Sequence, residues 1–300
     1  MRYTLRQLEV FLTVAREGSV SRAAKTLFMS QSAASGALAD LERQFNVHLF
    51  DRVGKRLQLS ELGNSIRAQA QSLYDAAAGL EEALAGRTAV GRLRIGATLT
   101  IGNTLAVPLM ARFLRSHPGA EPTLAVANTE EIARQVANFE IDVGLIEGEI
   151  EHPDLELTPW RDDQLVVFCA PDHPFARKRS LTDEDLRSAS WIVRERGSGT
   201  RQAFDRALRG LQPLRIALEL QHTEAIKGAV EAGLGVGCLS RLTLADAFAR
   251  KTLHPCRVPG RDFHRQFFFL LHRQKHRSAG IKAWLAVCQD DQAPSLTANR

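Results

Sequence analysis

The sequence predicts an all-α winged helix-turn-helix at the N-terminus, followed by one long linker helix and an α/β domain built on parallel sheets. Three observations support this order. Short capped amphipathic segments fill residues 1–60, an apolar stripe without proline follows, and strand and helix patterns alternate over residues 91–300. At 300 residues, the chain suits two or three domains, each with its own core.

The composition is that of an ordinary folded protein, with 44% hydrophobic and 24% charged residues. No apolar run approaches the ~18 residues needed to cross a bilayer, and Arg6, Glu9 and Arg16 interrupt the N-terminus where a signal peptide needs an apolar stretch. We therefore expect a cytoplasmic protein with no membrane partner. Four cysteines stand far apart without a CxxC pair, so we expect free thiols, no metal site and no cofactor.

Three helices are predicted in the N-terminal segment. The first lies between Thr4, a suitable N-cap, and Gly18, which follows its end. The second carries the small pair Ala23 and Ala24, and the third begins after the N-cap candidate Ser30. Two short helices separated by a tight turn form a helix-turn-helix.

The third helix opens with SQSAAS and presents Gln31, Ser32 and Ser35 on its first turns. In a helix-turn-helix this end enters the major groove, where Gln can pair with adenine and Ser can contact bases or phosphates. Ser30 joins these three as a candidate DNA-binding residue. The alternative is that Ser30 only caps the helix and Ser35 only faces solvent.

A β-hairpin wing is predicted from VHLFDRVGKRLQLSELG, which combines an apolar pair, a basic turn and an alternating LQL run. Its tip holds Arg52, Lys55 and Arg56. Positive side chains there suit phosphate contact beside the groove, although a solvated turn has the same pattern. Residues 1–60 hold nine Lys or Arg against five Asp or Glu, while the whole chain carries only +5. Double-stranded promoter DNA is the expected partner.

The stretch 5–63 resembles the N-terminal signature of LysR-type transcription regulators. The shared features are the Ala-Ala pair, the Ser-Gln helix start, Asp-Leu-Glu, Leu-Phe-x-Arg and Leu-Ser-x-x-Gly. The resemblance implies a DNA-binding regulator switched by a small effector. Gly36 departs from the pattern, because many members carry a long polar or basic side chain there. Glycine costs about 1 kcal/mol of helix propensity relative to alanine. Without a side chain at position 36, recognition of the DNA sequence rests more on Gln31, Ser32 and Ser35.

Residues 61–90 are predicted as a linker and dimerisation helix. A helix of about 25 residues runs about 38 Å, and its apolar stripe needs a partner, most simply the same helix of a second subunit. Burial against its own domain is the alternative. The family resemblance supports this homodimer, adds a homotetramer, and makes RNA polymerase a further candidate partner. The apolar stripe, which we call the seam, consists of Ile66, Ala70, Leu73, Ala77, Leu80 and Leu84.

From residue 91 onward, strand and helix patterns alternate, which predicts parallel sheets with ligands at the carboxyl ends of the strands. Expected helices include 201–208, and an expected strand covers 165–171. The family resemblance adds two lobes similar to periplasmic binding proteins. Lobe 1 is expected at about 91–161 and 266–300, and lobe 2 at about 162–265.

Two loop-to-helix junctions, one in each predicted lobe, form the candidate effector site. The first is 97–100, and the second is the run RGSGTR at 196–201. Helix N-termini offer unpaired N–H groups and glycines let the backbone approach a ligand, although plain capping would look the same. The candidate effector-binding residues are Thr98, Thr100, Glu147, Ser198, Thr200, Arg201 and Thr223.

The runs GATLTIGNTL, DVGLIEG and RERGSGTR resemble the LysR branch that contains regulators of sulfur assimilation and carbon dioxide fixation. This resemblance implies a small oxyanion, or a short carboxylate-bearing or phosphorylated metabolite, as the effector. Glu147 and Glu149 complicate an anionic ligand if they point inward, since they could pair with Arg201 or with a ligand amine.

Two other classes of function fit the sequence less well. An enzyme is disfavoured because the chain has no GxSxG elbow, HExxH, P-loop or dinucleotide fingerprint, so no catalytic residue is predicted. A transport-associated solute-binding protein would account for the effector lobes but not for the N-terminal DNA module.

Overall fold

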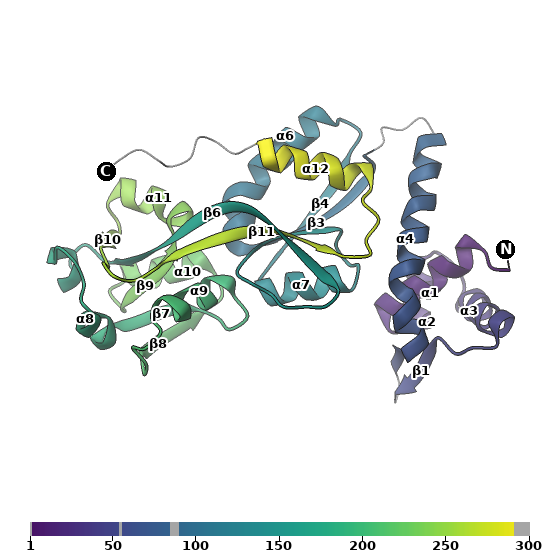
Figure 1. Ribbon diagram of the computed structural model, residues 1–300, viewed down its shortest axis with the longest axis horizontal. Coiled ribbons are helices and arrows are strands. Elements are labelled where there is room, and N and C mark those ends of the chain that lie inside the picture. Colours follow the sequence, from purple (N-terminus) through teal and green to yellow (C-terminus); the bar gives the residue numbers. More distant parts are fainter. Residues whose placement is uncertain (1, 54–55, 85–89, 291–300) are drawn as a thin grey trace.

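A computed structural model describes residues 2–53, 56–84 and 90–290 of the chain. Figure 1 shows a small N-terminal domain, a long helix, and an elongated α/β domain. The N-terminal domain consists of α1 (Leu5–Glu17), α2 (Val20–Thr26), α3 (Gln31–Phe45) and the antiparallel hairpin of β1 (Phe50–Val53) and β2 (Arg56–Leu59).

Local capping explains where the N-terminal helices begin and end. Thr4 forms a capping box with Gln7 at the start of α1, and Gly18 ends that helix with a left-handed φ of 61°. Ser30 caps α3 by accepting a hydrogen bond from the backbone N–H of Ala33. These contacts satisfy backbone groups that a helix end leaves unpaired.

The linker helix α4 (Glu61–Leu84) divides its apolar stripe between two environments. Its first turns pack into the N-terminal core through Ile66 and Ala70. Farther along, Leu73, Leu80 and Leu84 are exposed by 38%, 62% and 80%. The expected seam is therefore partly covered by its own domain, and its C-terminal half is left open to a partner helix.

Two groups of parallel strands in the α/β domain are joined by two long antiparallel strands. The sheet order is β4-β3-β5-β11-β6-β9-β7-β8, with β10 paired to β6. Lobe 1 contains the parallel strands β3, β4 and β5, and lobe 2 contains β7, β8 and β9. The strands are β3 (Arg92–Thr98), β4 (Glu121–Ala127), β5 (Val143–Glu147), β6 (Leu155–Cys169), β7 (Ser190–Arg194), β8 (Arg215–Leu220), β9 (Val236–Ser240), β10 (His254–Cys256) and β11 (His264–His272).

Helices cover both groups of strands, as Figure 1 shows. They are α5 (Leu99–Ile101), the π-helical η1 (Gly102–Ala106), α6 (Val107–Ser116), α7 (Thr129–Ala137), the 3-10 turn η2 (Pro174–Arg177), α8 (Asp183–Ser188), α9 (Gly199–Ala207), α10 (Thr223–Glu231), α11 (Arg241–Arg250) and α12 (Ala279–Asp290). The predicted fold class is confirmed: a two-lobed α/β domain follows a winged helix-turn-helix and a linker helix. In the described ranges, the helices are too short or too polar to cross a membrane.

Two expected boundaries were wrong. The strand expected at 165–171 is only the end of β6, which begins at Leu155. Its first part contains a proline and several charged residues because it lies between the lobes with much of its surface partly exposed, so it lacks an apolar strand pattern. The helix expected from Arg201 begins at Gly199, where Ser198 caps it.

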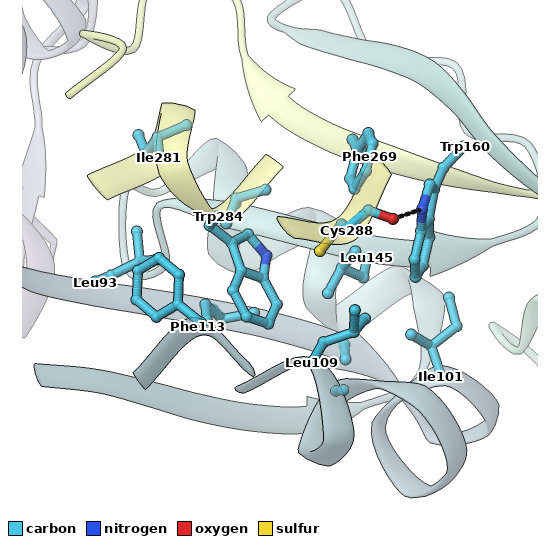
Figure 2. Close-up of a cluster of buried hydrophobic side chains, with 14 of the residues drawn as sticks. Leu93, Ile101, Leu109, Phe113, Leu145, Trp160, Phe269, Ile281, Trp284 and Cys288 are labelled. Carbon is cyan, nitrogen blue, oxygen red and sulfur yellow. Dashed lines mark hydrogen bonds between the residues drawn. The ribbon is translucent and has the colours of Figure 1, made fainter. Parts of the chain in front are cut away.

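Each lobe has its own apolar core. Figure 2 shows the core of lobe 1, where Trp284 of α12 meets Phe113 of α6 in an edge-on contact of 5.4 Å between ring centroids. The Trp160 indole N–H donates to the backbone oxygen of Cys288 at 3.0 Å. The core of lobe 2 is built around Trp191 and Phe204. The α/β domain thus holds two compact bodies joined by β6 and β11.

Candidate functional site: a DNA-binding face and an inter-lobe polar cluster

The start of α3 presents a short polar surface. Gln31, Ser32 and Ser35 are exposed there. The Ser30 hydroxyl is also exposed, but it already accepts from the Ala33 N–H at 3.1 Å and lies 2.9 Å from the Ser32 hydroxyl. Gln31 and Ser35 are therefore the side chains most free to contact base edges, and Ser30 positions the helix end.

The hairpin of β1 and β2 forms the wing, which follows α3 in the chain. Arg52 on β1 is exposed. Arg56 belongs to β2, but its side chain lies outside the described part of the structure, as does the whole of Lys55. At Gly36, a Cβ atom would meet no other atom within 4 Å. The glycine is therefore not needed for packing, and its position on exposed α3 is open to a longer side chain.

At the centre of the α/β domain, Glu147 is buried at the carboxyl end of β5, with 1% of its surface exposed. Its Oε1 accepts hydrogen bonds from the Thr100 hydroxyl at 2.9 Å and from the Thr200 hydroxyl at 3.1 Å. Thr100 belongs to lobe 1 and Thr200 to lobe 2. One carboxylate oxygen thus holds the two predicted helix starts together.

Arg265, the second residue of β11, supplies the positive charge of this inter-lobe cluster. Its Nε lies 2.6 Å from Asp163, and its Nη2 lies 3.5 Å from Glu147 Oε2. It also donates to the Thr200 hydroxyl at 2.9 Å and approaches the Thr100 hydroxyl at 3.4 Å. One buried cation therefore faces two buried carboxylates, and the cluster carries excess negative charge when both are ionised.

Several buried polar atoms near the strand and helix ends have no hydrogen-bond partner within the described ranges. They include Thr98 Oγ1, Glu147 Oε2 and Thr223 Oγ1. Thr98 stands at the N-cap position of α5 without making a side-chain capping bond. Unpaired buried polar groups cost free energy, so the Thr98 and Thr223 hydroxyls could bond a ligand at little further cost, whereas Glu147 Oε2 faces Arg265 at 3.5 Å.

A backbone contact also joins the lobes. The Thr129 hydroxyl at the start of α7 donates to the backbone oxygen of Glu147 at 2.9 Å and accepts from the Gly199 N–H at 3.0 Å. A Cβ at position 199 would overlap the Glu147 carbonyl. Only glycine allows the two lobes to approach this closely.

The structure therefore brings Thr100, Glu147 and Thr200 together, but it directs Arg201 elsewhere. The Arg201 guanidinium binds Asp205 and Glu219. Ser198 is buried and caps α9.

Sequence reasoning missed Arg265, Asp163 and Thr129. The signal for Arg265 was present, because it falls on the same face of its strand as the buried Phe267 and Phe269. A charged residue in that alternation needs a buried partner.

A cavity of about 860 Å³ lies next to the cluster. Gly199 and Arg265 belong to both the cavity lining and the inter-lobe contacts. Its wall carries charges of both signs, including Arg206 and Glu149. The cavity therefore provides a polar space from which a small molecule could approach the buried cluster.

The winged helix-turn-helix, the linker helix and the two-lobed domain define the chain as a DNA-binding transcription regulator with an effector-binding domain. Residues 5–64 match the bacterial regulatory helix-turn-helix protein model of the lysR family, and residues 86–293 match the LysR substrate binding domain model. The chain belongs to the LysR family.

Relatives agree with this assignment and with the expected branch of the family. The chain is 42% identical over 295 residues to the uncharacterized HTH-type transcriptional regulator YeiE of Escherichia coli K12, covering 98% of this chain and 100% of YeiE. It is 35% identical to the RuBisCO operon transcriptional regulator of Allochromatium vinosum over 292 residues, 95% of each chain.

Solved structures show the same fold. A full-length OxyR variant from Pseudomonas aeruginosa superposes with a TM-score of 0.75 at 24% identity, covering 97% of this chain and 94% of OxyR. The regulatory domain of CcmR from Synechocystis PCC6803, solved in complex with 2-PG, gives a TM-score of 0.62 at 32% identity. It covers 67% of this chain and 96% of that domain.

Proposed function

We propose that this regulator binds promoter DNA through α3 and the wing, and that a small oxyanion or acidic metabolite bound between the lobes switches that binding. The observation that carries the effector assignment is the Glu147 carboxylate, held between Thr100 and Thr200 and beside Arg265. The two hydroxyls and the guanidinium around this carboxylate support a ligand that brings negatively charged oxygen atoms.

An anionic effector takes the place of the Glu147 carboxylate. Its oxygen accepts from the two threonine hydroxyls, and its charge faces the Arg265 guanidinium. Glu147 must then turn away, because Arg265 already faces Asp163 and a third negative group beside one buried cation would be costly. Effector binding therefore requires the displacement of Glu147. The ligand binds the cleft with Glu147 displaced more tightly than the cleft with Glu147 in place, and this difference can shift the equilibrium between the two states.

The named relatives support a phosphorylated or carboxylate effector. The CcmR regulatory domain, 32% identical, was solved with 2-PG, and the A. vinosum relative regulates a RuBisCO operon. We carry over the class of ligand and not its identity. The free Thr98 and Thr223 hydroxyls provide additional donors for oxygen atoms of such a ligand.

The exposed half of α4 supports a homodimer. Leu73, Leu80 and Leu84 recur at spacings of seven and four residues and remain open to water, which fits a helix pair between two subunits. A tetramer of two dimers joined through the α/β domains completes the proposed assembly. In full-length protein, Leu73→Glu with Leu80→Glu should convert the tetramer to a smaller species in sedimentation velocity, whereas an unchanged species would contradict this seam.

Glu147→Gln tests the charge of the effector. Purified protein is screened by thermal shift with inorganic phosphate, sulfate, 2-PG and a panel of small carboxylates and amines, because a ligand of the native state raises the melting temperature. Removing the competing charge should tighten an anion about ten-fold, equivalent to ~1.4 kcal/mol. An effector that binds wild type but is lost in Glu147→Gln would be a donor or a cation, and would refute the anion assignment.

Thr200→Val tests the location of the site. It deletes one donor while keeping size and branching, and should weaken the same ligand by roughly 1 to 3 kcal/mol, about 5- to 150-fold. The matched control is Ser188→Ala, since the exposed Ser188 hydroxyl donates to the backbone oxygen of Asp185 in α8. Equal affinities in wild type, Thr200→Val and Ser188→Ala would place the pocket elsewhere.

A further inference from the structure

The linker helix is fastened to lobe 1 of its own chain by charged and polar groups, which we call the linker contact. Lys275, in the segment between β11 and α12, has only 4% of its side chain exposed. Its ammonium lies 2.6 Å from Asp75 of α4 and 2.8 Å from Asp142 of lobe 1. A buried lysine bound to both sides holds them in one position, since losing either carboxylate removes part of its compensation.

A second part of the linker contact is Arg67 of α4. It donates to the Asn138 side-chain oxygen at 2.9 Å and to the Asn138 backbone oxygen at 2.6 Å. Its guanidinium also lies 6.0 Å from the ring of Phe139. Phe139 has a φ of 56°, a conformation that non-glycine residues seldom adopt. Figure 1 shows α4 standing beside the segment that connects β11 to α12.

Two rigid elements connect the linker contact to the inter-lobe cluster. Helix α7 starts at Thr129, which bonds Gly199 of lobe 2, and ends next to Asn138. Strand β5 begins directly after Asp142 and ends at Glu147, and all of its residues are buried. Each element therefore has one end at the cluster and the other at the linker contact.

Helix α4 also carries the DNA-binding domain. Ala70 is buried in the N-terminal core, and the Tyr74 hydroxyl donates to Glu9 of α1 at 2.8 Å. Consequently, a change in the angle between α4 and lobe 1 moves the recognition helix α3 with it.

We propose that the docking of α4 on lobe 1 is coupled to the inter-lobe cluster through α7 and β5. Loss of the Thr129 bond to lobe 2 releases α7, and the linker contact at its other end weakens. This proposal rests on the effector cleft proposed above, and it names the path by which that cleft reaches the DNA-binding domain. Coupling of this kind is reciprocal, so loosening the linker contact also loosens the Thr129–Gly199 contact.

A cross-link across the linker contact provides the first test. Full-length protein carries Ser72→Cys and Gln274→Cys, two positions whose native groups are hydrogen-bonded, and is treated with a short bis-maleimide. The four native cysteines are buried and react slowly by comparison. The rate of intrachain cross-linking reports how much of the time α4 is docked.

Four substitutions are compared in this background, without any effector. Asp75→Asn should lower the cross-linking rate about ten-fold because it removes the charge that Lys275 binds on α4. Thr129 lies at the end of α7 opposite the linker contact, and Thr129→Val should still lower the cross-linking rate several-fold. Thr129→Ser, which keeps the hydroxyl, should restore the rate. Asp40→Asn, which breaks an exposed ion pair with Arg43 on α3, is the matched control and should leave the rate unchanged.

The reciprocal measurement uses hydrogen exchange of the Gly199 amide. In Asp75→Asn this amide should exchange faster than in wild type, although the substitution lies in a different domain; in Asp40→Asn it should not.

An unchanged or faster cross-linking rate in Thr129→Val, or an unchanged Gly199 amide in Asp75→Asn, would overturn the coupling. An unchanged rate in Asp75→Asn would overturn the linker contact itself. Because no ligand is added, each of these results leaves the effector assignment to be judged by its own test.

Discussion

Replacing Arg265 with methionine should destabilise the α/β domain more than any surface arginine would. Only 2% of the Arg265 side chain is exposed, and its loss leaves Glu147 and Asp163 buried without their cation. Removing one partner of a buried ion pair typically costs about 3 to 5 kcal/mol. For a domain of this size, ~1 kcal/mol corresponds to a shift of about 2–4 °C in melting temperature, so roughly 6–20 °C is expected.

Tryptophan fluorescence during urea unfolding measures this loss, because all three tryptophans, Trp160, Trp191 and Trp284, lie in the α/β domain. Arg134→Met is the matched control, since Arg134 is 48% exposed and pairs with the partly exposed Glu131 and Glu140. It should cost less than ~1 kcal/mol.

A charge-balanced variant separates lost charge from lost packing. The double variant Arg265→Met with Asp163→Asn removes one of the two carboxylates that have lost their cation. Ser240 can still donate to the side-chain oxygen at position 163. The double variant should recover stability relative to Arg265→Met alone. A loss below ~1 kcal/mol in Arg265→Met, or no recovery in the double variant, would refute the view that Arg265 neutralises the inter-lobe cluster.

Three further outcomes are expected. Gln31→Ala should weaken binding to the cognate operator more than to random DNA, whereas Arg52→Ala should weaken both and flatten the salt dependence in gel retardation; equal losses on both DNAs for Gln31→Ala would contradict base readout. Phe28 is 97% exposed and has a φ of 53°, so Phe28→Asn should stabilise the N-terminal domain by about 1 kcal/mol in thermal melts followed by circular dichroism. Burial opposes the charge of Asp142, but Arg94 and Lys275 outweigh it and lower its pKa to about 2. Stability from this carboxylate is present above its ordinary pKa and is lost as the pH falls from about 4 towards 2, so Asp142→Asn should show a flatter acid limb in unfolding.

Local sequence signals were sufficient for the N-terminal domain. The boundaries of α1 and α3 follow from Thr4, Gly18 and Ser30, each of which acts on backbone groups within a few residues. The pairing of Thr100 and Thr200 could also be anticipated, because both begin helices after buried strands of a parallel α/β fold.

The chemistry between the lobes was less accessible to sequence reasoning. Arg265 bonds Asp163 and Thr200, which precede it by 102 and 65 residues, and no local pattern encodes such distances. Arg201 was favoured by its place beside a glycine-rich turn, but its guanidinium turns to Asp205 and Glu219. Side-chain direction depends on the packing of neighbouring elements, which spacing alone does not specify.

The backbone contact at Gly199 makes the close approach of the two lobes sensitive to one added methyl group. A Cβ at this position would collide with the main chain of Glu147 and not with a movable side chain. A rotamer change therefore cannot relieve the clash that alanine would create. The two lobes could then meet only after a strand or a helix start had shifted. If the effector switches DNA binding as proposed above, a regulator with that single codon change would keep its lobes apart, and its promoter would lose the response to effector while the operator sequence remained intact.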